Sequence, residues 1–219
     1  MPANEPGGED AALLTLAQWL SPAFPLGAFA WSQGLEQAVA EGAVTDATGL
    51  ERWLDAVLRT GAGRADAVLL CAAMSAGADA DALAATARAL APSAERWAET
   101  REQGAAFVRT LAGMGGPRLP ACALPVAVGL AAADLGLRPD RVAALWLHSV
   151  AGGLVTVAVR HVPLGQTQGQ AVLARLAPAC REVAAEAART APADIAASTP
   201  GAELIVMAHE TAEVRLFRS

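Results

Sequence analysis

Apolar positions recur every three or four residues along most of this chain, which is the spacing of one buried face of an α-helix. The clearest stripe lies within residues 50–58 and consists of Leu50, Trp53, Leu54, Val57 and Leu58. Just before it, Thr48 and Glu51 have the spacing of a capping box, in which hydroxyl and carboxylate satisfy free backbone N–H groups. The pattern therefore predicts an amphipathic helix that opens at this box and ends at Gly61.

The same spacing predicts further helices between breaks rich in glycine and proline. A first helix, with apolar positions from Leu13 to Leu20, ends where Ser21 precedes Pro22, because a residue before proline is disfavoured in the α region. A rigid connector then leads to a second helix that stops near Gly42. The expected helices after the first cover residues 29–40, 48–60, 65–76, 81–90, 93–111, 121–134, 139–161 and 166–187. The expected loops are residues 113–120 and 188–202, and residues 203–207 are the only candidate for a short strand.

These elements predict an all-α fold, a single-domain multi-helix bundle with a short C-terminal docking tail. We expect a flexible N-terminus over residues 1–10, a helical domain over residues 11–189, and a linker with a partner-binding tail over residues 190–219. Apolar residues make up 54% of the chain and charged residues 17%, a composition that excludes a disordered protein. Nothing in the composition divides the chain into two domains.

One predicted helix is long enough to cross a membrane. Residues 142–159 are predominantly apolar and lie between two arginines. They also contain His148, Ser149, Thr156 and the pair Gly152-Gly153, and alanine and glycine contribute little transfer free energy. We interpret this stretch as the central core helix, with a membrane span as the alternative.

Charge and cysteine content narrow the location and the partners. The net charge is −6 and the pI is near 5.1, which disfavours binding to nucleic acid. Cys71, Cys122 and Cys180 are far apart and odd in number, so they predict no disulfide framework and fit a reducing cytoplasm. The acidic first ten residues do not resemble an export signal.

The sequence offers little catalytic chemistry. It contains no lysine, which excludes a Walker A phosphate loop and a lysine Schiff base. Residues 30–34 approach a nucleophile elbow around Ser32, but alanine replaces the first glycine, so we expect Ser32 to cap or pack at the start of the second helix. A hydrolase using Ser32 is the alternative.

The histidines predict no local metal site. His148 and His161 are separated by about 220° around an ideal helix. His209-Glu210 begins like HExxH, but Glu213 stands where the second histidine of that motif would be. We therefore expect no catalytic residue, no metal ligand and no intrinsic cofactor, and each histidine is expected to be structural.

The C-terminal residues 215–219 predict docking. Leu216 and Phe217 stand between Arg215 and Arg218, and each contributes roughly 1.5–3 kcal/mol when it is removed from water. Chain ends are commonly poorly ordered unless something holds them. We expect this tail to bind a partner, and the alternative is that it folds back on its own domain.

Taken together, the motifs resemble the UreF family of urease accessory proteins. The segment Ser21-Pro22-Ala23-Phe24-Pro25-Leu26-Gly27, followed by Ser32-Gln33-Gly34-Leu35-Glu36, is similar to the N-terminal signature of that family. Four further blocks follow in the expected order, namely residues 99–104, 124–129, 162–167 and the ending with His209-Glu210 before residues 215–219. The resemblance runs along nearly the whole chain. Departures from the family pattern are Ala30-Trp31, Ala208, residues 212–214 and Gly152-Gly153.

The resemblance implies a helical homodimer without covalent chemistry of its own. Such a protein joins the scaffold UreD (also called UreH) and the GTPase UreG in loading nickel into apo-urease, with GTP bound by UreG and nickel handled by the complex. The residues implied to bind UreD/UreH are His209, Glu210, Arg215, Leu216, Phe217, Arg218 and Ser219. The residues implied to form a signature surface or interface are Ser21, Pro22, Pro25, Gly27, Phe29, Ser32, Gln33, Gly34, Leu35 and Glu36. A helical regulator that binds a small molecule is the alternative function.

Overall fold

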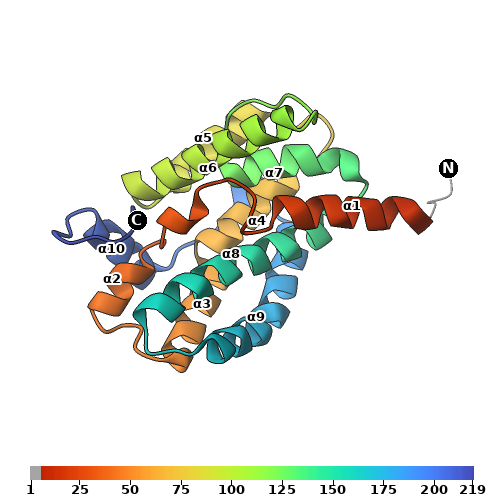
Figure 1. Cartoon of the computed structure of the whole chain (residues 1–219). Helices are drawn as coiled ribbons and strands as arrows, with labels where there is room; N and C mark the ends of the chain where they lie inside the picture. Colours follow the sequence, from red (N-terminus) through yellow and green to blue (C-terminus); the bar gives the residue numbers. More distant parts are fainter. Residues whose placement is uncertain (1–5) are drawn as a thin grey trace.

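The helices pack around a long central helix in a computed structural model that describes residues 6–219 (Figure 1). Within that part of the chain there is no strand, so the all-α prediction is confirmed. The α-helices are α1 (Pro6–Trp19), α2 (Leu35–Ala40), α3 (Ala47–Thr60), α4 (Ala62–Ala73), α5 (Ala80–Leu90), α6 (Ala94–Gly113), α7 (Leu124–Ala132), α8 (Pro139–His161), α9 (Gln166–Ala187) and α10 (Pro200–His209). Three short 3₁₀ helices complete the list, η1 (Ala28–Ala30), η2 (Ala133–Leu135) and η3 (Pro192–Asp194).

The core lies around α8, which packs along α9 and also contacts α4 and α2. Val142, Leu147 and Ala151 of α8 are fully buried. Within the described residues, α8 is the helix long and apolar enough to cross a membrane, and half of its most apolar window is buried inside the fold. Its packing on α9, α4 and α2 makes α8 the central core helix, as the sequence predicted.

The amphipathic helix α3 forms where it was predicted, but its cap differs. Leu50, Leu54 and Leu58 are buried. The N-cap is Asp46, whose carboxylate accepts a 2.7 Å hydrogen bond from Gly49 N. The predicted cap at Thr48 is therefore wrong. An aspartate two residues earlier starts the helix sooner by accepting from Gly49 N, and carboxylates are among the strongest N-caps.

The predicted second helix, residues 29–40, is shorter than expected and begins at Leu35. Gln33 has φ of +53° and Gly34 has φ of +78°, so both lie in the left-handed region that ends or precedes helices. A side chain on Gly34 would also meet Val206 of α10 at 2.6 Å. The left-handed pair turns the chain so that α10 can lie beside α2 (Figure 1).

The C-terminal part is more helical than predicted. Residues 203–207 lie in α10, so the possible strand there is wrong, and the predicted loop 188–202 already contains η3 and the first turn of α10. Pro200 occupies the first turn and Glu203 Oε1 accepts a 2.8 Å hydrogen bond from Thr199 N. A threonine followed by proline at the first helical position is a helix-start signal that the sequence analysis missed.

At the other end, α1 begins at Pro6, five residues before the expected start of the helical domain. Residues 1–5 of the predicted flexible N-terminus lie outside the described residues. The C-terminal end of α1 is tied to the core, because Ser149 Oγ of α8 donates a 2.6 Å hydrogen bond to the carbonyl of Leu20. This contact fixes where the following connector starts.

A close approach joins α6 to the start of α7. Thr100 Oγ1 accepts a 3.2 Å hydrogen bond from Leu124 N, one of the free N–H groups of the first turn of α7. One helical turn further, a Cβ on Gly104 would lie 1.9 Å from the carbonyl oxygen of Cys122. The helix and the backbone of residues 122–124 can therefore touch only because residue 104 is glycine.

We expect Gly104→Ala to lower the free energy of unfolding by about 1–3 kcal/mol, because the clash is with backbone that cannot rotate away. The matched control is Gly113→Ala in the same helix, where a Cβ meets nothing within 4 Å. There alanine should be neutral or stabilising by up to about 1 kcal/mol. Urea unfolding followed by circular dichroism measures both variants, and equal stabilities would contradict the packing described.

Candidate functional site

The motif segment, residues 21–36, connects α1 to α2 and carries the predicted signature residues. Its first turn is closed by hydrogen bonds from Ala23 N to Ser21 Oγ (3.2 Å) and from Phe24 N to the Ser21 carbonyl (2.9 Å). Gly27 has φ of +72° and turns the chain into η1. Phe29 in η1 is 78% exposed. The ordered, kinked connector predicted from the prolines is confirmed.

Ser32 and Gln33 hold the last residue of the sequence. The carbonyl oxygen of Ser219 accepts hydrogen bonds from Ser32 N, at 2.9 Å, and from Ser32 Oγ. Gln33 N donates to Ser219 Oγ at 3.3 Å. Ser32 and Ser219 are both buried. Ser32 Oγ also accepts from Glu36 N at 3.3 Å, so the predicted role of Ser32 at the start of α2 is confirmed.

Glu36 holds the backbone of the C-terminal tail, which we define as residues 210–219. Its two carboxylate oxygens accept hydrogen bonds from Leu216 N at 2.7 Å and from Phe217 N at 3.0 Å. Burial alone would raise the pKa of Glu36, but the two N–H donors and the adjacent His209 outweigh burial and hold that pKa below its ordinary value of 4.5. The charged carboxylate is therefore the form that binds the tail.

His209, the last residue of α10, lies buried between two carboxylates. Its Nδ1 is 2.7 Å from Glu95 Oε2 and its Nε2 is 3.2 Å from Glu36 Oε2. Glu95 also pairs with Arg215 at 2.6 Å, and Glu95 N donates to Glu210 Oε1 at 3.1 Å. The predicted tail residues thus meet the first turn of α6, an element that the sequence analysis did not connect with them.

The remaining tail residues contact the motif segment, α6 and α8. The Arg218 guanidinium stacks 4.3 Å from the centre of the Trp31 ring and pairs with Glu102 at 2.7 Å. The Phe217 ring is 91% buried and meets the edge of His161, with ring centres 5.2 Å apart. Leu216, by contrast, is 73% exposed. One of the two apolar tail residues is anchored, and its neighbour faces outward.

In this structure the tail therefore docks on its own subunit, and its binding to a partner stays a prediction. Folding back was the alternative in the sequence analysis. The physical reason is the carboxylate of Glu36, which lies far from Leu216 in sequence but satisfies its backbone N–H. The Leu216 side chain does not contribute to this internal docking, because only its backbone N–H contacts Glu36. The side chain can therefore contact a partner while the tail stays docked.

An apolar surface surrounds the docked tail. On α10, Val206 and His209 are buried toward α2, whereas Leu204 and Met207, three residues apart, are 66% and 44% exposed. We call the set of exposed apolar residues on this helix and the tail the outer face. It consists of Leu204, Met207, Val214 and Leu216. Exposed apolar side chains that gather on one surface are typical of protein interaction sites, so these residues are candidates for one.

A buried ionic cluster lies beneath the motif segment. Arg96 Nη2 pairs with Asp66 at 2.6 Å, and Arg96 Nη1 lies 3.3 Å from Glu99 Oε2. The other oxygen of Glu99 accepts from Gln33 Nε2 at 3.1 Å and from Gln103 Nε2 at 3.2 Å. Burial raises the pKa of Asp66; the nearby Arg96 opposes that rise and the Glu99 charge adds to it, so the pKa remains raised. Gln33 joins this cluster to the tail-binding residues.

The sequence predicted the signature and tail residues of this site but missed four residues that contact the tail. The structure brings predicted signature residues together with predicted tail residues. The signature residues are Ser32, Gln33 and Glu36, and the tail residues are His209, Glu210, Arg215, Phe217, Arg218 and Ser219. Ser21, Pro22, Pro25 and Gly27 shape the connector, Gly34 and Leu35 start α2, and Phe29 stands exposed. Glu95, Glu102, Trp31 and His161 were missed as tail contacts. The block of residues 99–104 signalled Glu102, and no signal pointed to Glu95.

The three cysteines and Ser32 offer no accessible nucleophile. Burial raises the pKa of Cys71 to about 12 and the pKa values of Cys122 and Cys180 to about 11, so these thiols remain protonated at neutral pH. Ser32 is fully buried under Ser219. Among residues 6–219, no three His, Cys, Asp or Glu side chains are grouped closely enough to hold a metal ion.

Comparison with known proteins connects this architecture to one family. The family model described as UreF matches residues 44–177. The urease accessory protein UreF of Cereibacter sphaeroides strain KD131 is 58% identical over 210 residues, which cover 95% of this chain and 99% of that protein. The UreF protein of Jannaschia sp. strain CCS1 is 52% identical, over 97% of this chain and 96% of that protein. The UreF protein of Roseobacter denitrificans is 44% identical, over 95% of this chain and 94% of that protein.

We expect Glu36→Gln to release the tail. Losing a charge-assisted acceptor for two N–H groups and for His209 should raise the rate of tryptic cleavage after Arg215 and Arg218 about tenfold or more. Glu41→Gln is the matched control, because Glu41 follows the same helix, is exposed and contacts Gln37 rather than the tail. Similar cleavage rates in the two variants would show that Glu36 does not hold the tail.

Acid should release the tail in the same way. Because the folded-state pKa of Glu36 lies below 4.5, its stabilising contribution is fully present above that pH and is lost as the pH falls through the folded pKa. Backbone amide chemical shifts of Leu216 and Phe217, followed by NMR, should show an inflection below pH 4.5 that is absent in Glu36→Gln. An inflection that survives in the variant would assign the transition to another group.

Proposed function

The chain belongs to the UreF family of urease accessory proteins, and on that premise we propose that it is a non-enzymatic scaffold in the loading of nickel into urease. In this proposal it binds UreD/UreH through the outer face and the tail. Together with the GTPase UreG, the assembly acts on apo-urease, with nickel as its cargo and GTP bound by UreG. We further propose that it acts in the cytoplasm as a homodimer.

The observation that carries this proposal is the exposed apolar area on an ordered tail. Leu216 and Val214 are 73% and 84% exposed although the backbone around Leu216 is hydrogen-bonded to Glu36. A side chain held outward in this way loses little conformational entropy on binding, and its burial contributes roughly 1.5–3 kcal/mol. The ordered tail therefore supports a role as a preformed anchor for a partner protein.

The chemistry available to the chain favours a helper role over a catalytic one. Without lysine it lacks the residue that contacts phosphates in P-loop proteins. The hydrolase alternative needs Ser32 to face a substrate, whereas its hydroxyl is buried and hydrogen-bonded to Ser219. Coupling of UreG GTP hydrolysis to nickel transfer rests on family membership alone and is part of the proposal.

A helical regulator that binds a small molecule is the second candidate. A cavity beneath the motif segment supports it, with a volume of about 190 Å³. The two proposals differ in what they expect of the tail. A scaffold loses its partner when the outer face is changed, whereas a regulator is indifferent to such changes because no outer-face residue lines the cavity that would hold its ligand.

We expect Leu216→Asp to weaken binding to the cognate UreD/UreH protein by more than about 1 kcal/mol, about fivefold in Kd or more, because the charge would enter an apolar interface. Since Leu216 is exposed, the isolated variant should keep its melting temperature. Phe217→Asp should weaken the same binding, but it should also detach the tail from its own subunit. Affinity is measured by surface plasmon resonance with immobilised scaffold.

The matched control is Leu14→Asp. Leu14 of α1 is also 73% exposed, and α1 extends away from the body on the side opposite the tail (Figure 1). It should bind the scaffold as the unchanged chain does. If Leu216→Asp and Phe217→Asp both bind with unchanged affinity, the tail is not an anchor and the proposal fails.

A further inference from the structure

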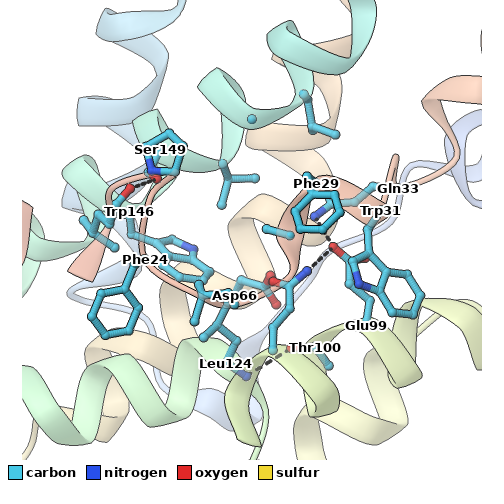
Figure 2. A pocket seen from close by; sticks show the side chains of 18 of the residues that line it. Phe24, Phe29, Trp31, Gln33, Asp66, Glu99, Thr100, Leu124, Trp146 and Ser149 are labelled. Carbon is cyan, nitrogen blue, oxygen red and sulfur yellow. Dashed lines mark hydrogen bonds between the residues drawn. The ribbon is translucent and has the colours of Figure 1, made fainter. Parts of the chain in front are cut away.

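The cavity beneath the motif segment gathers more than half of the aromatic residues of the chain. The sequence contains five tryptophans, four phenylalanines and no tyrosine. The aromatic residues that line this cavity of about 190 Å³ are Trp19, Phe24, Phe29, Trp31 and Trp146. Figure 2 shows Phe24 and Trp146 on one side of the space and Phe29 and Trp31 on the other. Such a concentration of ring faces is typical of sites for organic cations.

Two lining residues have buried polar atoms that lack a hydrogen-bond partner within residues 6–219. One is the indole donor Nε1 of Trp146, and the other is the acceptor Oε2 of Glu99. Their residues are 5% and 2% exposed. Glu99 Oε2 forms an ion pair with Arg96, whose Nη1 lies 3.3 Å away, whereas the indole N–H of Trp146 has no partner within the described residues. Buried polar atoms are nearly always paired, so the Trp146 N–H indicates a missing partner.

The charge at the inner end of the cavity is negative. Asp66 and Glu99 line it together with a single guanidinium, that of Arg96. A second cation, Arg160, also lines the cavity, but it is exposed and therefore screened by solvent. The inner end consequently favours a positively charged or hydrogen-bond-donating group, and the position of Arg160 makes the sign of the ligand charge a question that experiment can decide.

Water alone is a poor occupant. The lining is mostly apolar, with Leu26, Val128 and Leu154 beside the aromatic rings. Apolar walls bind water weakly, and a wholly apolar engineered cavity of about 150 Å³ binds benzene. The present cavity is of that size and adds the unpaired N–H of Trp146 and the carboxylate of Glu99. An amphipathic small molecule satisfies both the walls and the polar atoms.

We propose that this cavity binds a compact organic cation, an amine, amidine or guanidine with an apolar body and one hydrogen-bond acceptor. The cationic group donates to Glu99 Oε2, the body packs between the aromatic rings, and the acceptor takes the Nε1–H of Trp146. This site is separate from the outer face proposed to bind UreD/UreH, since none of the four outer-face residues lines the cavity.

Three probes of matched shape test the sign of the ligand charge. Isothermal titration of the full chain with 4-hydroxybenzamidine, 4-hydroxybenzamide and 4-hydroxybenzoate compares a cation, a neutral molecule and an anion. The cation should bind about tenfold more tightly than the amide, as expected for a charge-assisted hydrogen bond, and the anion most weakly. Glu99→Gln, which keeps the shape of the side chain, should remove the tenfold preference.

A second pair of variants keeps the test decisive even if Glu99→Gln fails to fold. Gly153 of α8 lines the cavity and is exposed, and a Cβ built on it meets nothing within 4 Å. Gly153→Leu should therefore fill the opening without disturbing the fold and should abolish binding of the cation. The neighbouring Gly152→Ala, whose Cβ meets only Leu173 at 3.6 Å, should leave the affinity unchanged.

The proposal is overturned by any of three results. These are no saturable binding of the cation, equal affinities for the three probes, and tightest binding of 4-hydroxybenzoate. The last result would show that the positive charges of Arg96 and Arg160 determine which ligand binds. Binding of the cation that survives Gly153→Leu would likewise place the site elsewhere and overturn the proposal.

Discussion

The carboxylate of Glu36 is the group on which the outer surface of this protein depends. It accepts the backbone N–H groups of Leu216 and Phe217 and faces His209, so a single charged side chain in α2 orders a tail from the other end of the sequence. Hydrogen bonds to a charged group are about twice as strong as neutral ones, and here two of them fix consecutive residues. Phe217 then turns inward onto His161 while Leu216 faces solvent.

The motif segment separates two environments with different chemistry. On one side it binds the tail, through Ser32 and Glu36. On the other it covers an aromatic cavity with a buried ionic cluster, and Gln33 belongs to both, since its backbone N–H contacts Ser219 and its side chain contacts Glu99. Trp31 also belongs to both, because it lines the cavity and stacks on Arg218. A change on either side therefore has a direct physical route to the other through these two residues.

Regular segments could be predicted from the sequence and irregular ones could not. The helices at residues 139–161 and 166–187 form with the predicted bounds, because their apolar spacing is uninterrupted and Pro139 and Gly165 define their starts. The expected helix at residues 29–40 forms only over Leu35–Ala40, because Gln33 and Gly34 both adopt left-handed conformations and glutamine gives no signal of such a turn. Residues of the site were predicted, but their pairing was not: hydrogen bonds such as Glu95 to His209 join residues over a hundred positions apart, and no local pattern encodes them.

Hydrogen exchange of the Leu216 and Phe217 amides in the isolated, full-length chain tests the central claim most directly. If Glu36 orders the tail without any partner, both amides exchange much more slowly than in an unstructured peptide, and they lose this protection together when Glu36 is replaced by glutamine. Exchange of both amides at the unstructured rate in the unchanged chain would contradict the account, because the tail would then need a foreign surface to become ordered.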